Sequence, residues 1–139
     1  MSQFSFVNKA VFWMVGICLV AFTTGCRDNR MVVPASAPCT LPDTVSFQGH
    51  IVPLLSQNCA LPDCHSGNSP QGNLNLEAAK AYSQLMKKGS GYIDTIRPQN
   101  SVLYSSLVSV TDPMPPTGKL NSCDIQLIVN WMAQKAKNN

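Results

Sequence analysis

Apolar residues recur at helical spacing in three stretches of the chain, and no stretch alternates like a strand. In the first, the positions i, i+3, i+4 and i+8 carry Ile51, Leu54, Leu55 and Cys59. This spacing places them on one face of a helix. Pro53 is compatible with a helix only in its first turn, so this helix is expected to begin near Gly49.

A second helix is predicted from about Leu76 to Met86, with Asn75 as its N-cap. A shorter helix is predicted from Ser101 to Ser109.

The last predicted helix has the clearest signals. Asn121-Ser122-Cys123-Asp124 resembles a capping box, and an apolar stripe follows at helical spacing, made of Ile125, Ile128, Val129 and Met132. The pattern therefore predicts an all-α domain of three to five helices, with long loops at residues 67–73 and 110–120. Loops of that length in so small a domain usually serve a function.

The N-terminus reads as a targeting segment. Residues 10–22 are an uncharged run of thirteen, too short for the roughly 20 residues that span a bilayer but suited to a secretory signal. The following Thr23-Thr24-Gly25-Cys26 resembles the bacterial lipoprotein signal, although Thr23 replaces the usual Leu. That resemblance implies a signal peptide at residues 1–25 and lipid on Cys26. A signal cut nearby and an uncleaved anchor helix are the alternatives.

Residues 26–42 carry three prolines and no hydrophobic period, which predicts a Pro-rich tether ahead of a domain at residues 43–139. The expected location is the bacterial cell envelope, lipid-anchored and facing the periplasm or the cell surface. Disulfides persist in such an oxidising compartment.

Composition narrows the function classes. The chain has 139 residues, which allows one domain, and 45% of them are hydrophobic, which excludes wholesale disorder. The net charge is +3, and the longest Lys/Arg cluster is Lys87-Lys88. A nucleic-acid partner is therefore not expected.

The cysteines carry the candidate chemistry. Cys59-Ala-Leu-Pro-Asp-Cys64-His65 is the C-x-x-C-H signature of covalent haem attachment with a four-residue spacer. Two thiols add to the two vinyl groups on one edge of the porphyrin, and the adjoining imidazole then reaches the iron. Pro62 favours a spacer whose extra residues loop out.

Other interpretations of the same residues remain open. Cys59 and Cys64 could form a plain disulfide with His65 incidental, or join His50 in a zinc site. His50 is more simply interpreted as a solvent-facing or capping residue.

A second axial ligand is available in Asp112-Pro113-Met114-Pro115-Pro116, where three prolines stiffen the backbone around a thioether. Met114 could instead fill a gap in the core within a rigid turn.

Taken together, the haem motif, the MPP loop and a C-terminal helix containing Trp131 resemble a small monohaem c-type cytochrome domain. Similar C-x4-C-H domains occur in lipoproteins of Bacteroidetes and planctomycetes, and the resemblance covers about Val45 to Asn138. It implies an all-α, cytochrome c-like fold around one covalent haem c. By the same resemblance Cys59 and Cys64 form the thioethers, His65 is the proximal ligand and Met114 the distal one.

Cys39 and Cys123 are then the unassigned thiols. In an oxidising compartment we expect them to pair, with free cysteines or an intermolecular bridge through Cys39 as alternatives. A porphyrin would also offer an apolar surface, and the residues expected to pack on it are Leu54, Leu55, Leu103, Leu107, Ile128 and Trp131.

The resulting hypothesis is a membrane-tethered electron carrier that exchanges single electrons with redox partner proteins and is not an enzyme. A haem-based ligand-sensing or accessory binding module is the first alternative. A haem-free structural lipoprotein stapled by disulfides is the second.

Overall fold

The computed structural model describes residues 39–139. The predicted signal peptide at residues 1–25, the predicted lipid site at Cys26 and the tether up to residue 38 lie outside the described residues.

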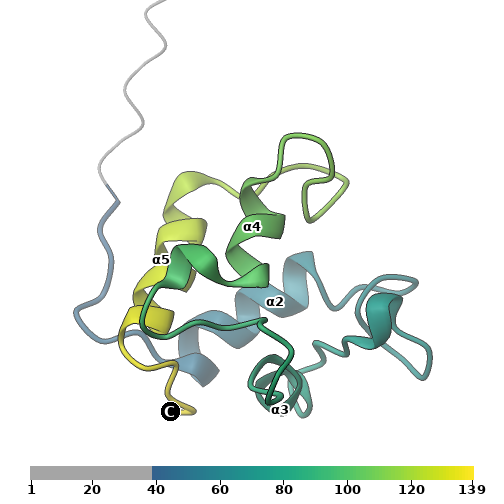
Figure 1. Cartoon of the computed structure of the whole chain (residues 1–139), viewed down its shortest axis with the longest axis horizontal. Coiled ribbons are helices and arrows are strands. Elements are labelled where there is room, and N and C mark those ends of the chain that lie inside the picture. Colours follow the sequence, from purple (N-terminus) through teal and green to yellow (C-terminus); the bar gives the residue numbers. More distant parts are fainter. Residues whose placement is uncertain (1–38) are drawn as a thin grey trace, which may run out of the picture. The chain divides into compact units, whose positions relative to one another are not determined.

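Residues 39–139 form an all-α domain, as predicted, with four α-helices and no strand among them (Figure 1). The α-helices are α2 (Val52–Asn58), α3 (Ala81–Leu85), α4 (Val102–Val108) and α5 (Ser122–Ala133). A π-helical turn, η1 (Phe47–Ile51), runs into α2, and the 3-10 turns η2 (Gln71–Asn73) and η3 (Pro98–Asn100) lie in the connections. In this part of the chain no helix is both long and apolar enough to cross a bilayer.

The first helical segment begins two residues before the predicted start. Ser46 is its N-cap, and its Oγ accepts the N–H of Gly49 at 3.0 Å. His50 reaches back so that its Nδ1 accepts the N–H of Ser46 at 2.9 Å. His50 is therefore a capping residue. Pro53 is the second residue of α2, directly after the π-helical turn, so the helical segment begins further before Pro53 than predicted.

The second helix is shorter than predicted. Regular helix begins only at Ala81, because Asn75 does not act as its N-cap. The Oδ1 of Asn75 instead accepts the N–H of Glu77, two residues on, and its Nδ2 donates to the carbonyl of Gly67. This buried side chain thus holds a turn against the loop at residues 67–73.

The helices α4 and α5 begin where their caps predict. The Oγ of Ser101 accepts the N–H of Tyr104, and the Oδ1 of Asn121 accepts the N–H of Asp124 at 2.9 Å. Side-chain oxygens at these positions satisfy backbone donors that the first turn of a helix leaves unpaired.

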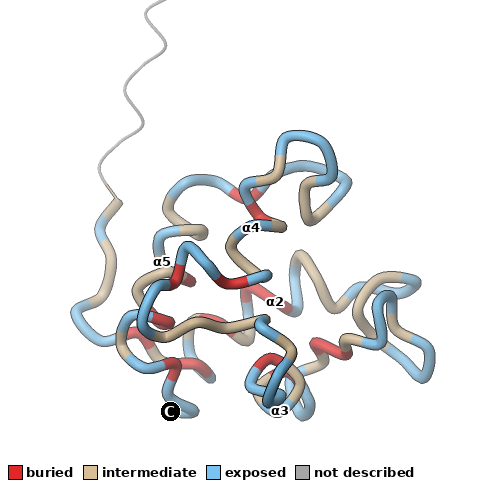
Figure 2. Tube along the Cα trace, in the orientation of Figure 1, coloured by how far each residue is buried: buried red, intermediate tan, exposed pale blue. Residues whose placement is uncertain are grey.

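The core is formed mainly by buried side chains of η1, α2 and α5, with contributions from α3 and α4; buried residues are red in Figure 2. The fully buried ring of Phe47 lies 5.1 Å from the ring of Trp131 and 5.2 Å from that of Tyr82. Asn139 accepts hydrogen bonds from the N–H groups of Gln48 and Phe47. The two ends of the domain therefore lie side by side.

A disulfide joins Cys39 to Cys123, with the two Cα atoms 5.4 Å apart. It ties the segment that precedes the domain to the first turn of α5.

Candidate functional site

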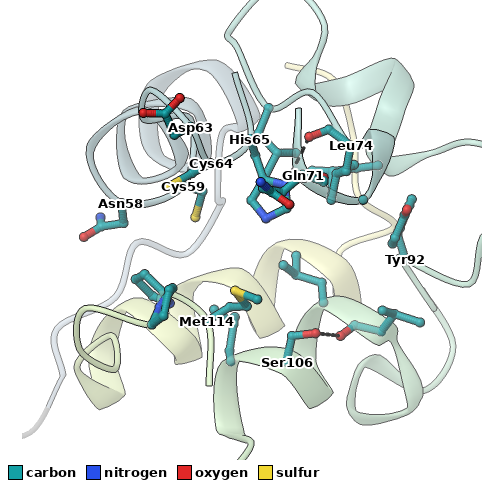
Figure 3. A pocket seen from close by; sticks show the side chains of 18 residues that line it. Asn58, Cys59, Asp63, Cys64, His65, Gln71, Leu74, Tyr92, Ser106 and Met114 are labelled. Carbon is teal, nitrogen blue, oxygen red and sulfur yellow. Dashed lines mark hydrogen bonds between the residues drawn. The ribbon is translucent and has the colours of Figure 1, made fainter. Parts of the chain in front are cut away.

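A cavity of about 340 Å³ separates the segment after α2 from α4 and the loop that follows it. Its walls include all four residues that the sequence nominates for haem: Cys59, Cys64, His65 and Met114. The imidazole enters from one side and the thioether faces it from the other (Figure 3). Residues that are 49 positions apart in the sequence, His65 and Met114, thus share one space.

The four-residue spacer loops out, as Pro62 suggests. The N–H of His65 donates to the carbonyl of Cys59 at 3.1 Å, and the N–H of Cys64 donates to that of Leu61 at the same distance. Asp63 takes the left-handed conformation, with φ of 63°, that this closure requires. The loop therefore turns both cysteines to the same end of the cavity.

Both cysteines of the motif are free thiols. Burial, and secondarily the neighbouring Cys64, raise the pKa of Cys59 to about 11. At neutral pH the Cys59 thiol is thus protonated. A disulfide between Cys59 and Cys64, one of the alternatives from the sequence, is absent from the described residues.

The imidazole of His65 is oriented by two backbone carbonyls. Its Nδ1 lies 3.1 Å from the carbonyl oxygens of both Gln71 and Leu74. Since carbonyls only accept, Nδ1 is the donor in both contacts, and Nε2 is the ring nitrogen that would be available to a metal ion. The ring is directed into the cavity (Figure 3). A histidine held in this way is suited to metal binding, because the second hydrogen bond fixes both tautomer and orientation.

Met114 lies on a loop fastened to α4. Its backbone N–H donates to the carbonyl of Ser106 at 3.0 Å, and Pro115 and Pro116 beside it also line the cavity. Its half-buried side chain faces the cavity instead of filling a gap in the core.

Met86 and Met132, two other methionines at helical positions, do not line this cavity. Met132 is fully buried in the core, where it accepts a hydrogen bond from Ser101, and Met86 is exposed.

The apolar residues that line the cavity differ in part from those predicted to pack on a porphyrin. Leu103 and Leu107 line the cavity as expected, but Leu54, Leu55, Ile128 and Trp131 do not. These four side chains instead form the core between η1, α2 and α5, because the apolar faces of those helices meet each other. Apolar wall residues that the sequence prediction missed are Leu74, Leu76, Leu85, Tyr92 and Val102. Part of this wall could have been predicted from the two leucines of Leu74-Asn75-Leu76, which directly follow the loop at residues 67–73.

A zinc site with His50 does not form. Among the described residues no three His, Cys, Asp or Glu side chains gather closely enough to hold a metal ion. The Nδ1 of His50 is already engaged with the N–H of Ser46.

The residues around the cavity fit a covalently attached haem. Two free thiols lie at one end, an imidazole and a thioether face each other, and the remaining wall is mostly apolar and includes five leucines. Sulfur and imidazole are the iron ligands that this donor set would supply.

Comparisons with known proteins support the class of domain, but not the roles of the four individual residues. A family model described as Planctomycete cytochrome C matches residues 62–118, which contain Cys64, His65 and Met114 and make up less than half of the chain. No curated protein and no solved structure matches significantly. The match supports a cytochrome c-like domain, a class defined by covalently bound haem c.

Proposed function

We propose that the domain is a monohaem c-type cytochrome that carries single electrons and is not an enzyme. Cys59 and Cys64 would hold one haem c through thioethers, with His65 as the proximal and Met114 as the distal ligand. The observation that carries the proposal is the meeting of these four side chains at one cavity.

When bound, a haem supplies a one-electron iron couple. The chain's own residues would set how it works. The hydrogen bonds from Nδ1 to two carbonyls hold the His65 ring in place, and the Ser106 carbonyl holds the Met114 backbone. Because His65 and Met114 would both bind the iron, no open iron position would remain for a substrate. A sulfur ligand raises the reduction potential relative to two histidines.

We further propose the location and the kind of partner. Lipid on Cys26 and the tether at residues 26–42 would hold the domain in the bacterial cell envelope, facing the periplasm or the cell surface. Redox proteins at the membrane or in the periplasm would then exchange electrons with it. The small-residue run before Cys26 and the prolines of the tether support this location.

The ligand assignment is tested by carbon monoxide binding to the reduced protein, made together with haem-maturation factors. The wild-type protein should not bind carbon monoxide at neutral pH, because Met114 fills the sixth position. Met114→Ala should bind it, and should lose the weak sulfur-to-iron band of the oxidised form. Met86→Ala, which removes an exposed methionine outside the cavity, is the matched control and should behave like the wild type.

Each alternative has its own outcome. Carbon monoxide binding by the wild type would favour a ligand-sensing or accessory module with an open iron position. A colourless wild-type protein would favour a disulfide-stapled structural lipoprotein.

A further inference from the structure

The segment Leu74-Asn75-Leu76 holds His65 at two points. The carbonyl oxygen of Leu74 lies 3.1 Å from Nδ1 of the imidazole (Figure 3), and the N–H of Leu76 donates to the backbone carbonyl of His65 at 2.7 Å. The two leucines line the cavity, whereas Asn75 between them does not. The position of the His65 ring therefore depends on how this segment is held.

Both ends of the Asn75 amide are hydrogen-bonded. Its Nδ2 donates to the carbonyl of Gly67 at 2.8 Å, and its Oδ1 accepts the N–H of Glu77 at 3.0 Å. Only 6% of Asn75 is exposed. Because a buried polar group that loses its partner is costly, these two bonds restrict the side chain to one arrangement. The adjoining peptide group, which carries the Leu74 carbonyl, is restricted with it.

The loop at residues 67–73 carries the other carbonyl at Nδ1, that of Gln71. Most of its residues are exposed, so hydrogen bonds hold it more than packing does. Its first residue, Gly67, is bonded on both sides, since its carbonyl accepts from Asn75 and its N–H donates to Oε1 of Glu77 at 3.1 Å. The Glu77 side chain is 41% exposed, whereas Asn75 is shielded from water. Asn75 therefore forms the buried half of this closure.

We propose that Asn75 is a positioning residue for the His65 imidazole, and that it lowers the reduction potential of the iron that His65 would bind. Its amide fixes the loop and the peptide group whose carbonyls accept from Nδ1. This inference rests on the proposed function, because it concerns the proximal ligand of the same haem.

The direction of the effect follows from the hydrogen bonds at Nδ1. A carbonyl that accepts from Nδ1 makes the imidazole a more basic ligand, and a more basic ligand stabilises ferric iron over ferrous iron. Without the Asn75 bonds this contact would weaken, so the reduction potential should rise. A loop that merely opened would act in the opposite direction, because water near the iron also stabilises the more highly charged ferric form. The sign of the shift thus separates a positioning role from a merely structural one.

The first test is redox titration of haem-loaded Asn75→Ala and Asn75→Ser. Serine keeps an oxygen that can accept the N–H of Glu77, as it does in turns of this kind, but it has no donor at the position of Nδ2. Both variants should raise the reduction potential. If the contact at Nδ1 loses the strength of one ordinary hydrogen bond, the ratio of reduced to oxidised protein at a fixed potential rises about fivefold, which is about 40 mV for one electron.

Two control variants leave the contacts of His65 in place. Asn121→Ser makes the same replacement at an asparagine whose Oδ1 also accepts a backbone N–H, at the start of α5. Phe47→Leu weakens the core at a residue that does not line the cavity. Both controls should keep the wild-type potential, although Phe47→Leu should lower the midpoint of urea unfolding.

A second measurement follows the His65 ring itself. In proton NMR spectra of the reduced protein, the Nδ1–H of His65 should exchange slowly with water, because it is held by two carbonyls. Asn75→Ser should speed this exchange by about the same fivefold factor. Asn121→Ser should leave it unchanged.

The outcomes separate the two proposals. A haem-containing Asn75→Ser protein with an unchanged or lowered potential, or with wild-type exchange at Nδ1, would overturn the positioning role alone. Asn75→Ser decides the question if Asn75→Ala does not fold, because it keeps the turn at Glu77. A wild-type protein without haem would overturn the proposed function, and the positioning role with it.

Discussion

The disulfide between Cys39 and Cys123 should contribute strongly to stability, because 84 positions separate its two cysteines. In the chain-entropy account, closing a loop of that length costs the unfolded state about 4.6 kcal/mol at 25 °C. Replacing both cysteines by serine removes that constraint. The helix caps of α5 remain, since Asn121 and Asp124 do not depend on the bond.

Haem attachment would change this figure little. Thioethers to Cys59 and Cys64 would bypass only the few residues between these two positions, so the loop closed by the disulfide keeps nearly its full length in the unfolded chain. We therefore expect the double serine variant to lose about 4 kcal/mol. That corresponds to about 15–30 °C in the melting temperature of a domain of this size.

The assay is unfolding by urea, followed by far-ultraviolet circular dichroism, in wild type and variants. Cys39→Ser alone, Cys123→Ser alone and the double variant should lose the same free energy, because any one of them removes the bond. A loss below about 1 kcal/mol would refute the loop-closure reasoning, as would single variants that differ from the double.

Three further substitutions test the packing of the core, the backbone conformation of the loop at residues 67–73 and the dependence of stability on acid pH. Phe47→Ala should cost about 3–5 kcal/mol in urea unfolding, because the ring is fully buried against Trp131; a loss under about 1 kcal/mol would contradict this packing. Gly72→Ala should cost about 1 kcal/mol, since Gly72 has a φ of 60°, a conformation that a Cβ atom disfavours, and an unchanged urea midpoint would count against it. The Gly67 N–H that Glu77 accepts lowers the pKa of that carboxyl below its usual value of 4.5. Ionised Glu77 therefore stabilises the folded state. Its contribution to the free energy of unfolding is complete above the pKa that Glu77 has in the unfolded chain, and it is lost as the pH falls through the pKa that Glu77 has in the folded protein. In the wild type the urea midpoint should therefore fall as the pH is lowered through this range, and Glu77→Gln should make that fall smaller. The same fall in both proteins would refute the stabilising role of ionised Glu77.

Sequence patterns located the parts of the fold that local chemistry determines. Ser101 and Asn121 are side-chain caps, so α4 and α5 begin where the sequence indicates. The C-x4-C-H motif likewise indicated His65, and the proline-rich segment indicated Met114; both residues line the cavity. Each of these signals is contained within a few consecutive residues.

The missed features depend on contacts between distant segments. Asn75 resembles a helix cap in sequence, but its bond to the carbonyl of Gly67 uses it to hold a loop. Trp131 and Leu85 look equivalent as apolar helix residues. Both are buried in the core, but Trp131 packs on Phe47, whereas Leu85 also lines the cavity, and only contacts between distant segments determine this difference.

The central claim is that Cys59 and Cys64 hold one haem, and peptide mass spectrometry of the protein made with haem-maturation factors tests it most directly. The account predicts that the peptide containing residues 59–65 carries the mass of exactly one haem, bonded through both sulfurs. Finding that peptide without haem, with its two cysteines either free or joined to each other, would contradict the account.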